Sequence, residues 1–145
     1  MTTQELNDIL NRLCGLEAEN EIVEFKEAKS NYDFTKLGKY FSALSNEANL
    51  KGKPFGWLVF GIEDKKHNIV GSIYRSKRKD LDSLKGEIAN KTTNRISFID
   101  IHEVNLPEGR VVMFQIPAAP KGIPTAFDGH YYARDGEELV PLNIE

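Results

Sequence analysis

Apolar residues recur at helical spacing close to the start of the chain. They form one stripe, consisting of Leu6, Ile9, Leu10 and Leu13. Thr2, followed three residues later by Glu5, is the pattern of a capping box, in which two side chains satisfy backbone N–H groups of the first turn. Gly15 follows the last apolar position, so the pattern predicts an N-terminal helix that ends near this glycine.

Two further segments have a helical apolar period. Asp33 is a suitable N-cap for a second helix, whose stripe consists of Phe34, Leu37, Phe41, Leu44 and Ala48. The loop-forming run NLKGKPFG at 49–56 follows it. A third helix is predicted to begin near Asp80, with an apolar face of Leu81, Leu84 and Ile88.

The remaining apolar segments read as strands. Residues 57–62 form a continuous apolar run, which indicates a strand buried on both faces, whereas residues 21–26 alternate. Residues 96–104 and 110–116 flank a Pro-Glu-Gly turn and predict a hairpin, and residues 130–134 predict a last strand. The order of elements predicts an α+β (α/β) domain with a mixed, mostly antiparallel sheet flanked by about three helices.

The end of the chain reads differently from these elements. The last residues, LVPLNIE, are a polar end for which no further element is predicted. We therefore expect the sequence to be the N-terminal module of a longer protein.

Composition narrows the class of protein. The chain has 145 residues, a formal net charge of −3 and one cysteine, so it has no overall basicity and no internal disulfide. It shows no signal-peptide pattern and no apolar run long enough to span a membrane, so we expect a cytoplasmic protein without a membrane partner.

The distribution of charge is more informative than its total. Residues 26–53 carry six lysines against three acids, and residues 74–95 carry seven lysines and arginines against three acids. A basic middle between acidic ends would form a basic patch, or it would simply be the solvated faces of two helices.

Carboxylates offer the strongest candidate chemistry. Glu24 and Lys26 are two residues apart on a strand and share a face, and Asp64 follows the buried strand 57–62. Glu19 has the opposite strand parity and joins them only if the chain bends between residues 19 and 22. If the two strands are neighbours, three carboxylates would converge on a site for Mg²⁺ or Mn²⁺. The alternative is a solvated strand face beside a charged turn.

Four ordered blocks of the sequence resemble the Schlafen AlbA-like domain family. They are ENEIVEFK at 19–26, SALSNEANLKGKPFGWLVFGIEDKKHNIVG at 42–71, the hairpin ending VVMFQIPAAPKGIPTAF, and HYYARDG at 130–136. The resemblance covers roughly residues 17–142, after an N-terminal helix over residues 1–16. It implies a domain that binds DNA or RNA, at the N-terminus of a transcriptional-regulator-like protein.

The resemblance also implies candidate site residues. Animal Schlafen proteins cleave RNA with a divalent metal, three carboxylates and a lysine, and the matching positions here are Glu19, Glu24, Asp64 and Lys26. The stretch NEANLKGKPFG at 46–56 departs from the family pattern, so the resemblance implies no role for Asn46 or Asn49. The animal enzymes use a duplicated core, so this single copy would need to form a homodimer to clamp a duplex.

Three functions therefore stay open from the sequence. The first is a nucleic-acid-binding module that contacts phosphates through Lys29, Lys36, Lys39, Arg75, Lys77, Arg78, Lys79 and Arg134. The second is a metal-dependent endoribonuclease with Mg²⁺ or Mn²⁺ on Glu19, Glu24 and Asp64. An interaction module without a nucleic-acid role is a third reading.

Overall fold

The computed structural model describes residues 1–15, 21–136 and 138–142. Its α-helices are α1 (Thr3–Cys14), α2 (Phe34–Leu50) and α3 (Arg78–Ala89), and a short 3₁₀ turn spans Thr93–Arg95. Its strands are β1 (Val23–Lys26), β2 (Phe55–Phe60), β3 (Asp100–Leu106), β4 (Gly109–Pro117), β5 (Ala126–Phe127), β6 (His130–Asp135) and β7 (Glu138–Pro141).

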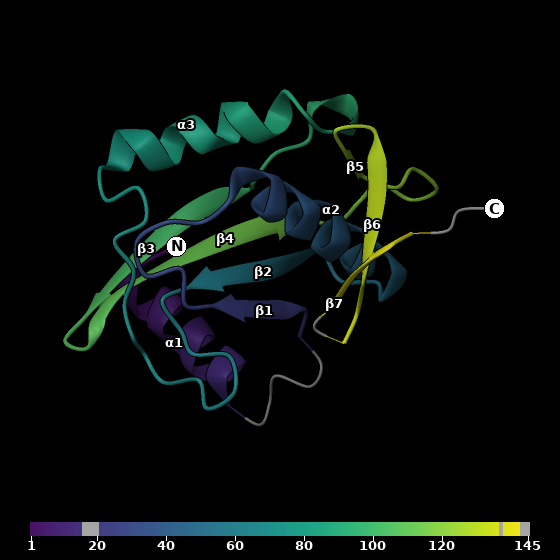
Figure 1. The fold of residues 1–145 in the computed structure, drawn as a ribbon. Coiled ribbons are helices and arrows are strands. Elements are labelled where there is room, and N and C mark those ends of the chain that lie inside the picture. Colours follow the sequence, from purple (N-terminus) through teal and green to yellow (C-terminus); the bar gives the residue numbers. More distant parts are fainter. Residues whose placement is uncertain (16–20, 137, 143–145) are drawn as a thin grey trace.

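The strands form two sheets (Figure 1). The larger sheet has the order β1-β2-β4-β3, in which β1 and β2 are parallel and the other pairs are antiparallel. The smaller sheet, β5-β6-β7, is antiparallel and packs its middle strand against α2. The predicted α+β fold with a mixed, mostly antiparallel sheet is confirmed.

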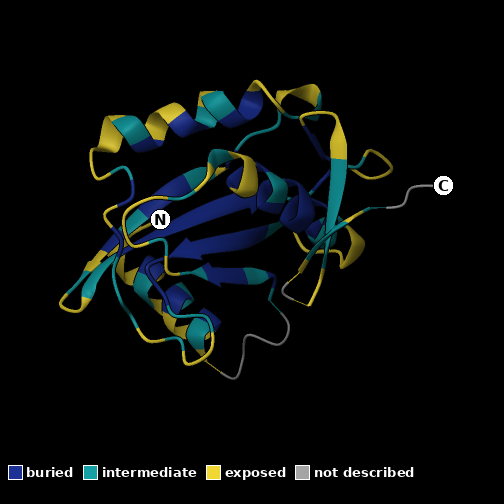
Figure 2. Cartoon of the chain, viewed as in Figure 1, coloured by how far each residue is buried: buried dark blue, intermediate teal, exposed yellow. Residues whose placement is uncertain are grey.

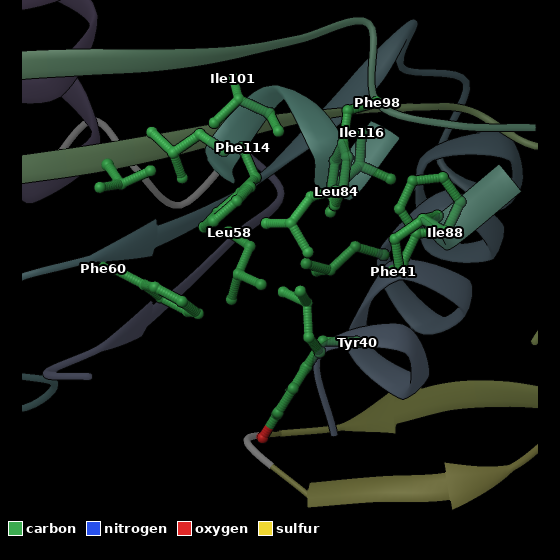
Figure 3. Close-up of a cluster of buried hydrophobic side chains, with 14 of the residues drawn as sticks. Tyr40, Phe41, Leu58, Phe60, Leu84, Ile88, Phe98, Ile101, Phe114 and Ile116 are labelled. Atoms are coloured by element: carbon green, nitrogen blue, oxygen red, sulfur yellow. The ribbon is translucent and has the colours of Figure 1, made fainter. Parts of the chain in front are cut away.

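Helices cover both faces of the larger sheet. Trp57 and Val59 of β2 pack with the apolar face of α1, and Leu58 and Phe60 pack with α2 and α3. Figure 2 accordingly shows most of this sheet in dark blue, the colour of buried residues. Figure 3 shows the cluster on the α2 and α3 side, to which both helices and the β-sheet contribute.

Local sequence signals account for the starts of α1 and α2. The capping box of Thr2 and Glu5 is present at the start of α1, and the Asp33 side chain accepts a hydrogen bond from the backbone N–H of Lys36 at the start of α2. The predicted start of the third helix at Asp80 is wrong by two residues: Lys77 is the N-cap of α3 and makes no side-chain capping bond.

The end of the chain corrects a second prediction. Residues 138–141 form β7, which pairs with β6, although this segment was predicted to contain no element. The signal was weak because β7 is a short strand with both end residues exposed. Its pairing depends on β6 rather than on its own apolar pattern.

One buried asparagine attaches β6 to the rest of the molecule. The side-chain amide of Asn46, on α2, donates to the carbonyl oxygens of Thr125 and Tyr132, both at 3.1 Å, and its oxygen accepts from the Thr125 N–H at 2.7 Å. Ser42 adds a bond from the Tyr132 N–H at 3.1 Å. These contacts fix the position of β6 along α2, and therefore the position of every side chain that β6 carries.

Replacement of Gly38 with alanine is expected to destabilise the protein by about 1–3 kcal/mol through overpacking. Gly38 lies inside α2, and a Cβ atom there would be 2.1 Å from the ring of Phe127. Gly86 is the matched control in α3, because nothing lies within 4 Å of its Cβ position. We expect Gly86→Ala to stabilise by about 0.5–1 kcal/mol. Urea unfolding followed by the fluorescence of Trp57 measures both, and changes of the same sign would contradict this account.

No helix in the described ranges, residues 1–15, 21–136 and 138–142, is both long enough and apolar enough to cross a membrane.

Candidate functional site

The carboxylate of Glu24 is buried at an edge of the larger sheet. Strand alternation places Phe25 in the cluster beneath α1 and turns Glu24 and Lys26 toward α2. The shared face of Glu24 and Lys26 was predicted from the sequence. The prediction missed that this face is covered, because the Glu24 side chain is only 2% exposed.

Arg134 of β6 covers Glu24. Its Nε and Nη2 donate to the two carboxylate oxygens of Glu47, on α2, at 3.0 and 2.7 Å. Its Nη1 donates to the Val23 carbonyl oxygen at 2.6 Å and to Oε1 of Glu24 at 3.2 Å. One guanidinium therefore joins β1, α2 and β6, and it is only 13% exposed.

Lys26 approaches Glu24 from another direction. Its Nζ is 3.7 Å from Oε2 of Glu24 and 4.8 Å from the centre of the Tyr40 ring. Tyr40 belongs to the buried cluster on this side of the sheet, and Figure 3 shows its hydroxyl oxygen pointing out of that cluster. Both oxygens of Glu24 thus have a cationic neighbour.

Burial and charge act in opposite directions at this site. Burial raises the pKa of Glu24 above its ordinary value, and the Asp64 carboxylate raises it further, while Arg134 and Lys26 oppose the rise without cancelling it. Burial lowers the pKa of Lys26, but a hydrogen bond with Tyr40 and the charges of Glu24 and Asp64 outweigh that effect, so its pKa is raised. Asp64 follows β2, which is the parallel neighbour of β1, and its charge acts on the pKa of both residues.

Tyr32 closes the same region from the segment before α2. Its ring packs on Phe60 with centroids 4.8 Å apart, and its hydroxyl oxygen is buried without a hydrogen-bond partner in the described part of the chain. Burial raises the pKa of this hydroxyl, and the negative charge of Glu24 contributes to the rise. The phenol is therefore neutral across the physiological pH range.

A divalent metal does not fit the described residues as they stand. Glu19, the third predicted ligand, lies outside the described residues. Among residues 1–15, 21–136 and 138–142, no group of three or more histidine, cysteine or acidic side chains is placed to hold a metal ion. Glu24 faces a guanidinium and an ammonium, so a cation would have to displace Arg134 to reach it.

The predicted phosphate-contacting residues of α3 and the segment before it divide into paired and unpaired groups. Arg75 forms an ion pair with Glu87, and Arg78 lies within 4.0 Å of three carboxylates, those of Asp82, Asp100 and Glu103. Lys77 and Lys79 are exposed, and neither has an ion-pair partner among the described residues. Most of the arginine charge in this region is therefore compensated within the molecule.

The lysines near the start of α2 are less compensated. Lys36 lies over the Tyr32 ring at 5.9 Å and Lys39 over the Tyr132 ring at 5.6 Å. In the described part of the chain, no carboxylate is within ion-pair distance of either ammonium group. We call Lys36, Lys39, Tyr32 and Tyr132 the α2 lysine–tyrosine surface. Lys29 is exposed nearby in sequence and is 3.7 Å from Glu27.

Sequence reasoning missed Glu47 and the structural role of Asn46. Glu47 lies off the apolar stripe of α2, yet its side chain is only 13% exposed. A signal for Asn46 was present: Ser42, Ser45 and Asn46 place polar groups beside Phe41 and Leu44 on the buried part of α2. Such a pattern indicates a helix face that meets backbone from another segment.

Comparisons with known proteins give one family by sequence, and a similar fold among solved structures. The family model described as "Schlafen, AlbA_2" matches residues 19–143. Among curated proteins, none is significantly similar to the chain.

Two solved structures have a similar fold. The DIP2311 protein of Corynebacterium diphtheriae has a TM-score of 0.57 and 22% identity over 84% of this chain, which spans 22% of that protein's chain. The N-terminal domain of a RecG-related protein from Nitrosomonas europaea has a TM-score of 0.53 and 17% identity, covering 95% of this chain and 93% of that domain. At these identities the likeness shows the fold alone.

Proposed function

Because the chain belongs to the Schlafen, AlbA_2 family, we propose that it is a nucleic-acid-binding domain that contacts backbone phosphates through the α2 lysine–tyrosine surface. Lys36 and Lys39 carry this proposal, because they are one helical turn apart and lack carboxylate partners among the described residues. Uncompensated lysines attract phosphates, and adjacent tyrosine rings suit unpaired bases.

The wider family setting supports the same proposal. The Schlafen AlbA-like domain is often described as a DNA-binding or RNA-binding domain, and the RecG-related protein is described in connection with ATP-dependent DNA helicases. By the same resemblance, we propose that the domain works within a transcriptional-regulator-like protein. The C. diphtheriae protein is consistent with a domain inside a longer chain, since the match spans 22% of it.

Removal of Lys36 and Lys39 together is expected to weaken nucleic-acid binding. Each lysine that contacts a phosphate contributes about one unit to the slope of log K against log salt, so Lys36→Gln/Lys39→Gln should reduce that slope by about two. We expect a loss of affinity of about tenfold or more at roughly 50 mM salt. Fluorescence anisotropy with labelled single-stranded RNA, single-stranded DNA and duplex DNA measures both quantities.

The double variant Lys77→Gln/Lys79→Gln is the matched control. It removes the same charge at the start of α3, where acidic side chains lie close to Arg78, and we expect a smaller loss of affinity. Equal losses in the two double variants would indicate diffuse electrostatic attraction rather than the α2 surface. Failure of the unaltered protein to bind any of the three ligands at low salt would overturn the proposal.

A second candidate is a divalent-metal-dependent endoribonuclease that uses Glu19, Glu24, Asp64 and Lys26. One observation favours it: β1 and β2 are parallel neighbours, so Asp64, which follows β2, comes after the same end of the sheet as Lys26. The charge of Asp64 also raises the pKa of both Glu24 and Lys26. The contact of Arg134 with Glu24 opposes it in this conformation. Incubation of the domain with transfer RNA and Mn²⁺, against EDTA and against Glu24→Gln, separates the two functions, since only the enzyme gives cleavage that needs both the metal and Glu24.

A further inference from the structure

We propose that Arg134 is a positioning residue of the nucleic-acid-binding surface rather than a contact to phosphate, and that its contact with Glu47 holds the ring of Tyr132 beside Lys39. This role rests on the proposed function, because it concerns the same α2 lysine–tyrosine surface. It differs from the phosphate contact that the sequence predicted for Arg134.

The hydrogen-bond donors of Arg134 are occupied inside the protein. A guanidinium has five N–H groups, and here they make two hydrogen bonds to Glu47, one to the Val23 carbonyl oxygen and one to Glu24. The Arg134 side chain is only 13% exposed. A phosphate would therefore have to compete with two carboxylates for Arg134, whereas the two lysines of the α2 surface have no carboxylate within ion-pair distance in the described part of the chain.

One edge of β6 depends on side chains of α2, against which this strand lies in Figure 1. β5 is a two-residue strand that pairs with His130 and Tyr131 of β6. At the next residue, the Tyr132 N–H donates to the Ser42 hydroxyl and the Tyr132 carbonyl oxygen accepts from the Asn46 amide, both at 3.1 Å. Side chains of α2 thus take the place that a longer β5 would fill.

The contact between Arg134 and Glu47 continues this attachment. Glu47 follows Asn46 on α2, and Arg134 lies two residues after Tyr132 on β6, so the side chains of Tyr132 and Arg134 share a face of the strand. Nε and Nη2 of Arg134 donate to the two carboxylate oxygens of Glu47 at 3.0 and 2.7 Å. A bidentate contact fixes direction as well as distance. It therefore opposes rotation of β6 about its own axis, the motion that would turn the Tyr132 ring away from Lys39.

Tyr132 is the ring that this arrangement presents to a nucleic acid. The other tyrosine of the surface, Tyr32, packs on Phe60 with ring centroids 4.8 Å apart, and its hydroxyl oxygen is buried. The ammonium group of Lys39 lies 5.6 Å from the centre of the Tyr132 ring. When this lysine turns to a phosphate, the ring face is left for a neighbouring unpaired base, and stacking of that base adds affinity.

The test is the binding of labelled single-stranded RNA and single-stranded DNA, measured by fluorescence anisotropy over a range of salt concentrations. Arg134→Gln/Glu47→Gln removes both partners of the contact and leaves the net charge unchanged. We expect its binding to be weaker by about fivefold or more, as for the loss of one stacked base, with the slope of log K against log salt unchanged. Lys39→Gln should instead reduce that slope by about one.

Tyr132→Leu shows whether the contact acts through the ring. It should weaken binding by a similar factor, and its combination with Arg134→Gln/Glu47→Gln should weaken binding by less than about twofold more, because both changes remove the same interaction. Leu84→Ala controls for destabilisation in general, since Leu84 is a fully buried residue of α3, and it should bind within about twofold of the unaltered protein. The fluorescence of Trp57 confirms that each variant is folded before titration.

Arg134→Lys provides a second route if the double variant does not fold. It keeps the positive charge but loses the planar bidentate geometry. A positioning role predicts weaker binding by Arg134→Lys, whereas a phosphate contact would keep most of its affinity with lysine.

The outcomes separate this role from the proposed function. A salt slope reduced by about one in Arg134→Gln/Glu47→Gln, or full affinity in Arg134→Lys, would overturn the positioning role. A loss in Leu84→Ala as large as that in the double variant, or a fully additive loss with Tyr132→Leu, would overturn it as well. If binding depends on Lys36 and Lys39 while any of these results is found, or if only duplex DNA binds, the proposed function stands and the positioning role falls. If the unaltered protein binds no nucleic acid, both fall.

Discussion

Arg134→Gln is expected to lower the free energy of unfolding by about 3–5 kcal/mol at pH 7, the typical cost of leaving one partner of a buried ion pair uncompensated. The reason is specific to this site. Arg134 faces two carboxylates whose side chains are 2% and 13% exposed. Its loss leaves these poorly solvated charges with only the weaker contacts of Lys26 at 3.7 Å and Lys51 at 3.4 Å among the described residues. Urea unfolding followed by the fluorescence of Trp57 measures the change.

The destabilisation by Arg134→Gln should increase as the pH rises. The pKa of Glu24 in the folded protein is raised above its ordinary value of 4.5. Glu24 therefore contributes fully to stability below about pH 4.5, and this contribution is lost as the pH rises through the raised pKa. Removal of Arg134 removes an interaction that lowers this pKa. The destabilisation by Arg134→Gln should therefore be smaller near pH 5 than near pH 8.

An exposed ion pair provides the control for this prediction. Arg12 and Glu21 are 2.9 Å apart, but their side chains are 42% and 27% exposed. Arg12→Gln should therefore cost less than about 1 kcal/mol at either pH. Glu24→Gln should cost little at pH 7 or stabilise the protein, because it removes a charge that burial opposes. A destabilisation by Arg134→Gln no larger than that of Arg12→Gln would show that the contacts of Arg134 with Glu24 and Glu47 contribute little to stability.

Those elements of the fold that depend on a local sequence pattern could be predicted from the sequence. The stripe of α1, the N-cap of α2 and the parity of β1 are local patterns, and the structure has each of them. The shared face of Glu24 and Lys26 follows from strand geometry alone. The start of α3 was missed because Lys77 offers no side-chain cap to mark it.

The covering of the site could not be predicted in the same way. Arg134 meets Glu47 across 87 positions and Glu24 across 110 positions of the chain, so neither contact leaves a local pattern. The charge of α3 is an intermediate case. Segment counts gave a basic region, yet Arg78 and Asp82 are four residues apart on one helix, which is the spacing of an intrahelical ion pair. The count also left out Asp100 and Glu103, which lie outside the counted segment and are close to Arg78, so it overstated the basic surface of α3.

Asn46→Ala is expected to lower the free energy of unfolding by about 3 kcal/mol, because a buried hydrogen bond contributes about 1 kcal/mol and its loss leaves the partner unsatisfied. The Asn46 side chain makes three such bonds of 3.1 Å or less, to both backbone polar groups of Thr125 and to the carbonyl oxygen of Tyr132. Alanine is a better helix former than asparagine, which offsets only a few tenths of a kcal/mol to about 0.7 kcal/mol.

Asn49 offers a matched control, because it is an asparagine of the same helix and its side chain makes no hydrogen bond within the described residues. Asn49→Ala should therefore leave stability unchanged or raise it slightly. Asn46→Ala should also weaken the attachment of β6 to α2 and thereby the contacts of Arg134. Hydrogen exchange of the β6 amides should therefore accelerate more than that of the β4 amides. Equal acceleration in both strands would mean that Asn46 stabilises the domain as a whole and does not specifically position the strand that covers Glu24.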